Sequence, residues 1–373
     1  MSVAGSRPLR VLVDAAILRP DLLGIRTYID GVVSALSHRA DLEVIVATSH
    51  PEDLPVDPGV EVIALPRHVQ DFGRRALWRE RSLHDLVRGT KADVVLAPVP
   101  ELPVRRLPVP AVMVVHDVKQ ILAPALGGRL RWLRATLDLP RACAAASVVV
   151  CVSHSTLAAL HSTVRVDPAR CVVIPEAPQL SLDARSRSGH SRDADPFFLY
   201  AGALMPHKNV STLLRAFAPG EPSLRARLVM VGSASLPELR ALDRLREELG
   251  IGDRVVHLGP VTPERLGELY ADALALVSPS LHEGFGLPVL EAMAAGTPAL
   301  VTELPAFREL AADAARYVVE PLDPGRWRAE LARLCDDPAE RRALGDQGRE
   351  RARRYSWERV GERFAEVLLT LTS

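Results

Sequence analysis

Short apolar runs alternate with amphipathic stretches along the whole chain. In the first half the apolar runs are rich in Val and mostly bounded by Pro, Gly or Asp. Their continuous, non-alternating apolar character is typical of parallel strands that are covered on both faces. We expect strands at Leu9–Ala16, Leu42–Thr48, Val60–Leu65, Val94–Ala97, Ala111–Val115, Ser147–Val152 and Cys171–Ile174, and helices at Arg26–Leu36, Arg74–Val87, Arg129–Ala145 and Ser153–Leu160.

The pattern breaks at residues 176–196, which contain few apolar residues and show no period, and it then restarts. The end of the chain, from Tyr355 to Leu371, reads as one amphipathic helix. In the second half we expect strands at Phe197–Ala201, Leu228–Val231, Val255–Leu258, Leu274–Val277 and Ala299–Thr302, with helices that include Val210–Phe217, Pro237–Leu249 and Pro263–Ala271.

This alternation predicts an α/β protein with two Rossmann-like domains. A chain of 373 residues, 48% of them hydrophobic, is long enough to bury two cores. We expect a first domain at 1–175, a linker at 176–196, a second domain at 197–354 and a C-terminal helix at 355–373. Two such domains imply a cleft between them, which is the expected place for a ligand.

Composition narrows the class of protein. The formal net charge is +0, so we expect no general attraction to nucleic acid. The four cysteines show no C-x-x-C spacing and fit a reduced, intracellular protein. We see no signal peptide and no run of about 20 apolar residues, and we expect a cytoplasmic protein. Lysine occurs only at positions 91, 119 and 208, so each lysine merits inspection.

Residues 283–296, with the sequence EGFGLPVLEAMAAG, carry the most chemical information. Gly284 and Gly286 let the backbone approach a ligand closely, and Pro288 suits the first turn of a helix. A helix N-terminus reached through glycines favours a phosphate. Glu283 and Glu291 stand on either side of it, and carboxylates accept hydrogen bonds from hydroxyls. The segment therefore indicates a site for a phosphorylated sugar or a nucleotide.

This block resembles the E-x7-E motif of the retaining, nucleotide-sugar-dependent glycosyltransferases of family GT4, which have the two-domain GT-B fold. The resemblance implies that Glu291 binds the ribose hydroxyls of the nucleotide. It also implies that Glu283 and the backbone N–H groups after it hold the donor sugar and the diphosphate. These N–H groups belong to Gly284, Phe285, Gly286 and Leu287. The alternative is a buried helix in which Glu291 makes a structural pair.

A second motif follows the predicted strand at Phe197–Ala201. Gly202 and the pair Lys208-Asn209 resemble the G-x5-K-N element of the same family, where the Lys contacts the donor diphosphate. Its place after a strand puts Lys208 in the crevice where doubly wound sheets bind ligands. Some family members have an Arg just after the Gly, whereas this chain has Ala203. The alternative is a surface lysine at a helix start.

In the first domain, His116 and Asp117 directly follow a predicted strand, and family members have a similar His-Asp pair with the His near the donor sugar. The alternative is an Asp that caps a helix beside a packed His. Gly24 resembles the glycine-rich loop near the donor phosphates, although many members have two glycines there. Asp14 is either an acceptor-side polar group or a structural cap. We take His116, Lys208 and Glu283 as the predicted catalytic residues.

The segment from His257 to Val261 resembles the one whose backbone contacts the nucleotide base, and we include Leu258 and Val261 in the donor site. Backbone contacts carry no side-chain code, so the sequence does not separate UDP from GDP. Asp193 and Asp195 match the D-x-D metal motif of another glycosyltransferase fold, but they lie in a polar linker. We expect neither a metal nor another cofactor.

Two basic stretches contain one tryptophan each: residues 74–79 with Trp78, and residues 129–134 with Trp132. They indicate either a peripheral membrane contact of the first domain or ordinary helices with arginine outside and tryptophan in the core.

The resemblance implies a GT-B enzyme that moves a sugar from a UDP- or GDP-sugar to an acceptor hydroxyl with retention and without metal. The C-terminal helix is expected to cross back to the first domain. The acceptor is open: a natural-product intermediate, a lipid or a saccharide. Alternatives are a GT-B phosphorylase, a sugar-nucleotide epimerase, or a nucleotide-sugar or dinucleotide binding protein without transferase activity. No G-x-G-x-x-G follows either domain's first strand, which argues against dinucleotide binding.

Overall fold

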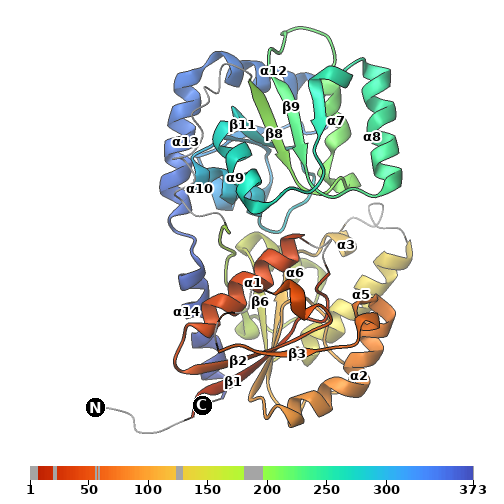
Figure 1. Ribbon diagram of the computed structural model, residues 1–373, viewed down its shortest axis with the longest axis vertical. Helices are drawn as coiled ribbons and strands as arrows, with labels where there is room; N and C mark the ends of the chain where they lie inside the picture. The colour runs from red at the N-terminus through yellow and green to blue at the C-terminus, as the bar shows by residue number, and fades with distance from the viewer. Residues whose placement is uncertain are drawn as a thin grey trace. The chain divides into compact units, whose positions relative to one another are not determined.

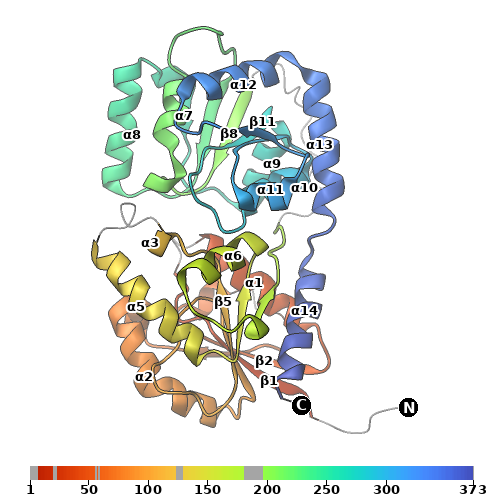
Figure 2. The ribbon, with the colours of Figure 1, turned by 180° about the vertical axis from the view of Figure 1, so that it is seen from behind.

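The computed structural model describes residues 7–19, 23–54, 57, 59–122, 129–179 and 196–372. The chain divides into two compact units. The first comprises Met1–Ala177 together with Tyr355–Ser373, and the second comprises Pro178–Arg354. Each unit has its own parallel sheet with helices on both sides (Figures 1 and 2). The predicted α/β fold with two Rossmann-like halves is confirmed.

The first unit is built on a seven-stranded parallel sheet in the order β3-β2-β1-β4-β5-β6-β7. Its strands are β1 (Leu9–Asp14), β2 (Leu42–Thr48), β3 (Glu61–Ala64), β4 (Val94–Ala97), β5 (Ala111–Val115), β6 (Val148–Cys151) and β7 (Cys171–Val173). Its helices are α1 (Leu23–Ser37), α2 (Phe72–Gly89), α3 (Lys119–Leu122), α5 (Arg129–Ala145), α6 (His154–Thr163) and α14 (Trp357–Thr370).

The last helix, α14, belongs to the first unit although it ends the chain. It packs against α1 so closely that a glycine on each helix leaves no room for a side chain. A Cβ on Gly31 would lie 2.2 Å from Cε2 of Trp357, and a Cβ on Gly361 would lie 2.9 Å from Cβ of Ala35. The Trp357 ring also meets the ring of Tyr28 edge-on, with 6.1 Å between centroids. Close helix packing therefore fixes the C-terminal helix on this unit.

The second unit is built on a six-stranded parallel sheet in the order β10-β9-β8-β11-β12-β13. Its strands are β8 (Phe197–Ala201), β9 (Arg227–Val231), β10 (Val255–His257), β11 (Ala275–Ser278), β12 (Ala299–Thr302) and β13 (Arg316–Val318). Its helices are α7 (Val210–Ala216), α8 (Leu236–Leu249), α9 (Pro263–Asp272), α10 (Leu287–Ala295), α11 (Pro305–Ala311), α12 (Pro324–Asp336) and α13 (Pro338–Ala352).

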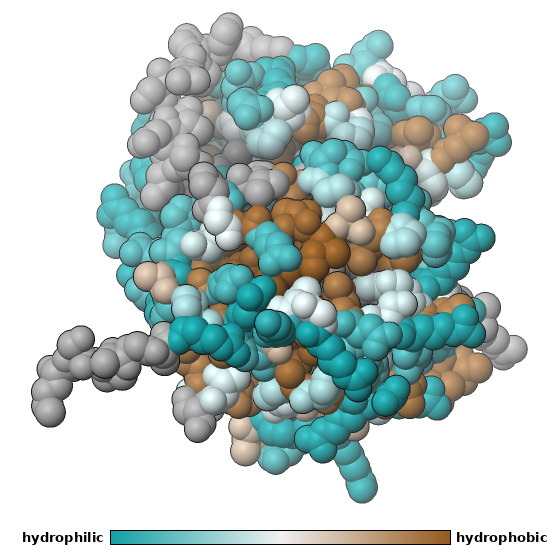
Figure 3. All heavy atoms as spheres, turned by 60° about the horizontal axis from the view of Figure 1, so that its bottom comes forward, coloured by the Kyte–Doolittle hydropathy of each residue, from teal (hydrophilic) through white to brown (hydrophobic). Residues whose placement is uncertain are grey.

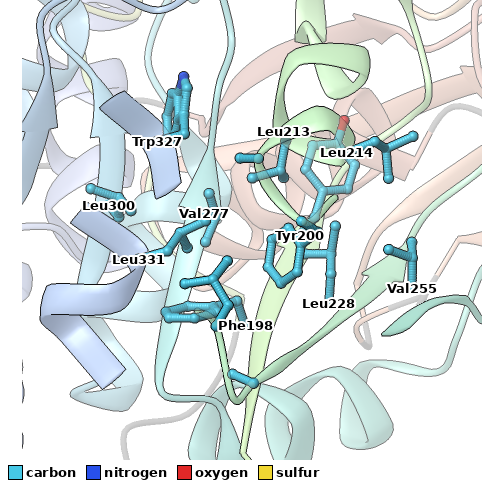
Figure 4. Close-up of a cluster of buried hydrophobic side chains, with 14 of the residues drawn as sticks. Phe198, Tyr200, Leu213, Leu214, Leu228, Val255, Val277, Leu300, Trp327 and Leu331 are labelled. Carbon is cyan, nitrogen blue, oxygen red and sulfur yellow. The ribbon is translucent and has the colours of Figure 1, made fainter. Parts of the chain in front are cut away.

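Local signals set the ends of these helices. Ser235 caps α8 in a capping box with Glu238, and Gly250 ends the helix in the left-handed region with φ +62°. The core of the unit gathers large side chains from several strands and from helices α7 and α12. Figure 4 shows Phe198, Tyr200 and Trp327 among them. Trp327 is fully buried, and its Nε1 donates a hydrogen bond of 3.0 Å to the carbonyl oxygen of Pro321.

Candidate functional site

The order of the second sheet reverses between β8 and β11, because β9 and β10 lie on one side and β12 and β13 on the other. In doubly wound sheets a ligand binds outside the carboxyl ends of the strands at this reversal. Here the segments that follow β8 and β11 meet there. The backbone N–H of Leu281 donates a hydrogen bond of 2.8 Å to the carbonyl oxygen of His207, which joins the two loops.

Lys208 and Glu283 form an ion pair across this reversal point. Nζ of Lys208 lies 2.5 Å from Oε1 of Glu283, and the two side chains are 18% and 15% exposed. Two of the three predicted catalytic residues, 75 positions apart in the chain, are therefore in direct contact. Their catalytic role stays a prediction.

Helix α10 begins beside this pair. Gly286 is its N-cap residue, with φ +107°, and a Cβ there would lie 2.7 Å from Cε1 of Phe307. Both the backbone conformation and the space therefore require glycine. Pro288 lies in the first turn and Phe285 is buried, so the helix start is rigidly held. Its dipole presents positive potential toward the segment that carries Glu283.

Glu291 lies inside α10 and is 8% exposed. Its Oε2 accepts a hydrogen bond of 3.0 Å from the hydroxyl of Tyr270, which is fully buried on α9. The burial of Tyr270 and the charge of Glu291 raise the pKa of that hydroxyl well above its ordinary value, so it stays a donor. No pattern of residues in the sequence indicated this contact.

Asn209 and Gly202 both make contacts within the second unit. Asn209 has φ +53°, a region that Asn tolerates better than most residues. Its Nδ2 donates to the carbonyl oxygen of Pro321 at 2.8 Å, and its Oδ1 accepts from Oγ1 of Thr212 at 2.7 Å. A Cβ added to Gly232 would lie 2.1 Å from the backbone carbonyl oxygen of Gly202, so the two segments pack closely at this point. Their donor-binding roles stay predictions beside these structural ones.

The segment after β10 is the one predicted to face the nucleotide base. Leu258 is 43% exposed, and its N–H already bonds the carbonyl oxygen of Met230 at 2.9 Å. Gly259 turns the chain with φ +70°, and Val261 is half-buried. Leu258 therefore presents an apolar side chain at the carboxyl edge of the sheet, rather than a backbone N–H group.

His116 follows β5 in the first unit, and both its ring nitrogens have partners. Nε2 lies 2.9 Å from the carbonyl oxygen of Pro98, and Nδ1 lies 2.9 Å from Oε1 of Glu176. Burial lowers the pKa of His116, but the hydrogen bond and the charge of Glu176 outweigh it and leave the pKa raised. The ring of Tyr28 packs edge-on against the imidazole at 4.6 Å. This arrangement favours an imidazolium that donates from both nitrogens.

Asp117 pairs with a lysine next to it in space. Nζ of Lys119 lies 2.7 Å from Oδ2 of Asp117, and the N–H of Lys119 donates to Oδ1 at 3.2 Å. Burial raises the pKa of Asp117, but Lys119 outweighs burial and leaves the pKa below its ordinary value. Gly24, in the first turn of α1, is exposed, and a Cβ added there would meet nothing within 4 Å.

A buried charge network lies at the order reversal of the first sheet, between β1 and β4. Arg79 bonds Oδ2 of Asp14 at 2.5 Å and also pairs with Glu101, which accepts two bonds from Arg75 at 2.8 and 2.9 Å. Burial raises the pKa of Glu101, but the two arginines outweigh it and bring the pKa to about 2. Asp14 is fully buried in an ion pair rather than exposed to an acceptor.

The two basic helices differ from each other. On α2, Arg75 and Arg79 point inward to the network above, and Trp78 packs against the core. Trp78 is half-buried, and this side of α2 is part of the packing of the unit. On α5, Trp132 is 37% exposed, and Leu133 and Leu137 beside it are exposed as well.

Two further findings concern the described parts of the chain alone. No group of three or more His, Cys, Asp or Glu side chains there could hold a metal ion. No helix there is long and apolar enough to cross a membrane. Asp193 and Asp195 lie outside the described residues.

Two family models match this chain. The model described as Glycosyltransferase Family 4 matches residues 23–177, and the model described as Glycosyl transferases group 1 matches residues 183–351. The chain belongs to glycosyltransferase family 4. The predicted family is thereby confirmed, and the two models divide the chain close to the boundary between its two units.

Relatives within family 4 include a D-inositol 3-phosphate glycosyltransferase of Thermobispora bispora, 38% identical over 194 residues. That alignment covers 49% of this chain and 45% of the relative. This chain thus spans about half the length of the curated relatives of that name that it matches.

Solved structures confirm the GT-B fold. Sucrose-phosphate synthase from Thermosynechococcus elongatus superposes with a TM-score of 0.80 at 21% identity, covering 97% of this chain and 99% of the other. Anabaena HepE in complex with UDP-glucose superposes with a TM-score of 0.75 at 17% identity, covering 97% and 100%.

Proposed function

We propose that this protein is a metal-independent, retaining glycosyltransferase that moves a sugar from a nucleoside diphosphate sugar to an acceptor hydroxyl. The carrying observation is the contact of Lys208 with Glu283 beside the N-terminus of α10, in a chain of family 4. A cation and a helix dipole suit a diphosphate, and a carboxylate next to them suits sugar hydroxyls.

Charge separation is the step that these groups assist. As the bond between the sugar carbon and the phosphate oxygen breaks, positive charge grows on the sugar and negative charge on the leaving diphosphate. Lys208 and the start of α10 are fixed before the reaction, so they stabilise the leaving group without reorganising. The carboxylate of Glu283 pairs with Lys208 in the structure. We propose that it also accepts hydrogen bonds from hydroxyls of the donor sugar.

The acceptor is proposed to meet the first unit, near His116 and Asp117. His116 is held between Glu176 and the carbonyl of Pro98, and its raised pKa favours the charged form. That form is a hydrogen-bond donor and a fixed positive charge rather than a base. We assign no nucleophile. In this proposal the leaving diphosphate accepts the proton of the acceptor hydroxyl. The acceptor oxygen then attacks the sugar carbon from the face that the diphosphate leaves.

The donor is proposed to be a UDP- or GDP-sugar. HepE, a structural neighbour, binds UDP-glucose, which supports UDP without deciding it for this chain. The acceptor class stays open among natural-product intermediates, lipids and saccharides. A GT-B phosphorylase, an epimerase and a binding protein without transferase activity remain the alternatives.

Proton NMR of the reaction tests this proposal and separates the alternatives. The purified protein is incubated with UDP- or GDP-sugars, with and without candidate acceptors, in EDTA. Release of nucleoside diphosphate and an α-configured product from an α-configured donor supports retaining transfer without metal. Turnover that requires inorganic phosphate indicates a phosphorylase, and an isomerised nucleotide sugar indicates an epimerase. Activity lost in EDTA and restored by Mn²⁺ contradicts metal independence.

We further propose a cytoplasmic location with a peripheral contact to an anionic membrane. The exposed apolar residues that support it lie on three helices of the first unit: Phe72 and Leu77 on α2, Leu122 on α3, and Trp132, Leu133 and Leu137 on α5. Arg74 on α2 is 65% exposed beside them. Single exposed apolar residues are common, and the face of the molecule drawn in Figure 3 mixes hydrophobic with hydrophilic residues.

Sedimentation with vesicles tests the membrane contact. Binding to vesicles that contain anionic lipid, weaker with neutral vesicles and weaker in a Trp132→Ser, Leu133→Ser variant, is expected. Equal sedimentation of the variant and the wild-type protein would remove this part of the proposal.

A further inference from the structure

Tyr270 lies next to Glu291 in the interior of the second unit. The tyrosine is fully buried on α9, and Glu291 lies on α10. The hydroxyl of Tyr270 donates a hydrogen bond of 3.0 Å to Oε2 of Glu291. A phenol has a single hydrogen to donate, so in this structure that donor belongs to the carboxylate.

The backbone of Tyr270 also accepts a hydrogen bond. Oγ1 of Thr297, which follows α10 and is 1% exposed, donates a hydrogen bond to the carbonyl oxygen of Tyr270. The N–H of Thr297 bonds the carbonyl oxygen of Ala292 at 2.8 Å, which ties Thr297 to α10. Tyr270 therefore connects α9 and α10 at two points, one of which is the carboxylate of Glu291.

Two other tyrosine hydroxyls in the described part of the second unit have a different kind of partner, one on the buried Tyr200 and one on the half-buried Tyr317. Tyr200 donates to the carbonyl oxygen of Ala203 at 2.9 Å. Tyr317 donates to the carbonyl oxygen of Ala312 at 2.6 Å. Those contacts satisfy a backbone carbonyl, whereas the hydroxyl of Tyr270 bonds an ionisable side chain.

We propose that Tyr270 is a positioning residue that orients the carboxylate of Glu291 toward the ribose hydroxyls of the donor nucleotide. This inference rests on the proposed function. An ionised carboxylate accepts about four hydrogen bonds, so Glu291 can hold Tyr270 and ribose hydroxyls together. Without the phenol the carboxylate loses a fixed donor and can rotate, and ribose recognition suffers while the rest of the nucleotide site is intact.

The test is a calorimetric titration with UDP and GDP and with their 2′-deoxy and 3′-deoxy counterparts. The proteins are wild type, Tyr270→Phe, Glu291→Gln and the double variant. Tyr317→Phe is the control, since it removes a hydrogen-bonded hydroxyl of a half-buried tyrosine in the same unit, and that hydroxyl bonds the backbone rather than Glu291. Tyr270→Phe is expected to weaken binding of the ribonucleotide about tenfold, and to bring its preference over the deoxy forms close to one.

The double variant separates positioning from a general structural effect. If Tyr270 acts through Glu291, Tyr270→Phe adds no further loss to Glu291→Gln. Thr297→Val provides a second variant should Tyr270→Phe fold poorly, and it is expected to change the same preference by a smaller factor. The melting temperatures of all variants are measured to check that the proteins are folded.

Three results would overturn the inference. Tyr270→Phe could keep wild-type affinity and preference, it could weaken ribo and deoxy forms equally, or its loss could add fully to that of Glu291→Gln. In each case a lost ribose preference in Glu291→Gln alone would leave the proposed donor site standing. An unchanged preference in Glu291→Gln would instead remove the ribose role of Glu291, and this inference with it.

Discussion

Lys208 and Glu283 form an ion pair with each other in the structure. Their side chains are less than one-fifth exposed, so leaving either charge without a counter-charge is costly. In the proposed function, a bound diphosphate takes the place of Glu283 as the partner of Lys208, and Glu283 then accepts hydrogen bonds from the sugar. The proposal therefore requires a ligand that carries both negative charge and hydroxyls.

Replacing Lys208 with Met is expected to lower turnover by about 100-fold, because the leaving diphosphate loses its fixed cation. Steady-state kinetics with a nucleotide sugar measures the effect. Lys91→Met is the control: Lys91 is an exposed lysine in the first unit. A Lys208→Met enzyme that turns over at the wild-type rate would refute the diphosphate role.

Gly24 offers a test of a close ligand approach. Its surroundings leave open space for a Cβ, so Gly24→Ala should fold and gain up to about 1 kcal/mol of stability from helix propensity. If a ligand lies against this backbone, the same change should lower kcat/KM by at least about tenfold. Gly73→Ala, in the first turn of α2 with equally open space, is the control. Full activity in Gly24→Ala would place the ligand elsewhere.

Individual residues show where sequence reasoning ends. Asn209 was predicted from a motif, yet the sequence could not show that its side chain bonds Pro321 and Thr212, because those contacts depend on the fold. Arg75 and Arg79 read as part of a basic surface, but they neutralise Asp14 and Glu101 in the interior. Charge pattern alone cannot distinguish an exposed arginine from one with a buried carboxylate partner.

Among the elements, helix packing of α14 on α1 depends on Gly31. Gly31→Ala would force a Cβ against Trp357, and overpacking of this kind costs roughly 1–3 kcal/mol. Thermal unfolding should therefore show a lower melting temperature than wild type. Gly89→Ala in α2, where a Cβ meets nothing within 4 Å, should show no such loss. Equal melting temperatures would mean that α14 contributes little to the stability of the unit.

Strands were predictable to the extent that they are long and apolar. Continuous apolar runs such as Ala111–Val115 are easy to recognise in the sequence, because a strand that is buried on both faces has an apolar residue at every position. Strand β13 was missed, since Arg316–Val318 is only three residues long and begins with an arginine. Helices α12 and α13 were also not predicted, and their many charged residues obscure the apolar period.

For the whole molecule, the order of the strands in each sheet was not predicted. That order brings the loops after β8 and β11 together and so creates the contact of Lys208 with Glu283. Residue spacing carries no such information over 75 positions. The motifs and the family resemblance nevertheless indicated both residues, which lie in the segments that follow β8 and β11.

The free energy of unfolding at acid pH should depend on the ion pairs of Glu101 with Arg75 and Arg79. The pKa of Glu101 is lowered to about 2 from 4.5, so its contribution is present above 4.5 and is lost as the pH falls toward 2. Glu101→Gln should therefore flatten the acid limb of the stability curve measured by urea unfolding. Glu61→Gln, at a half-exposed carboxylate, is the control. An unchanged acid limb in Glu101→Gln would contradict the network's role.

Binding of a nucleoside diphosphate tests the central claim most directly. The measurement is calorimetry with UDP, GDP, ADP, TDP and NAD in EDTA, on wild-type protein and Glu291→Ala. The account predicts that at least one nucleoside diphosphate binds the wild-type protein without metal, and that Glu291→Ala binds it at least about tenfold more weakly. Binding of NAD alone, no binding at all, or equal affinity in the variant would contradict it.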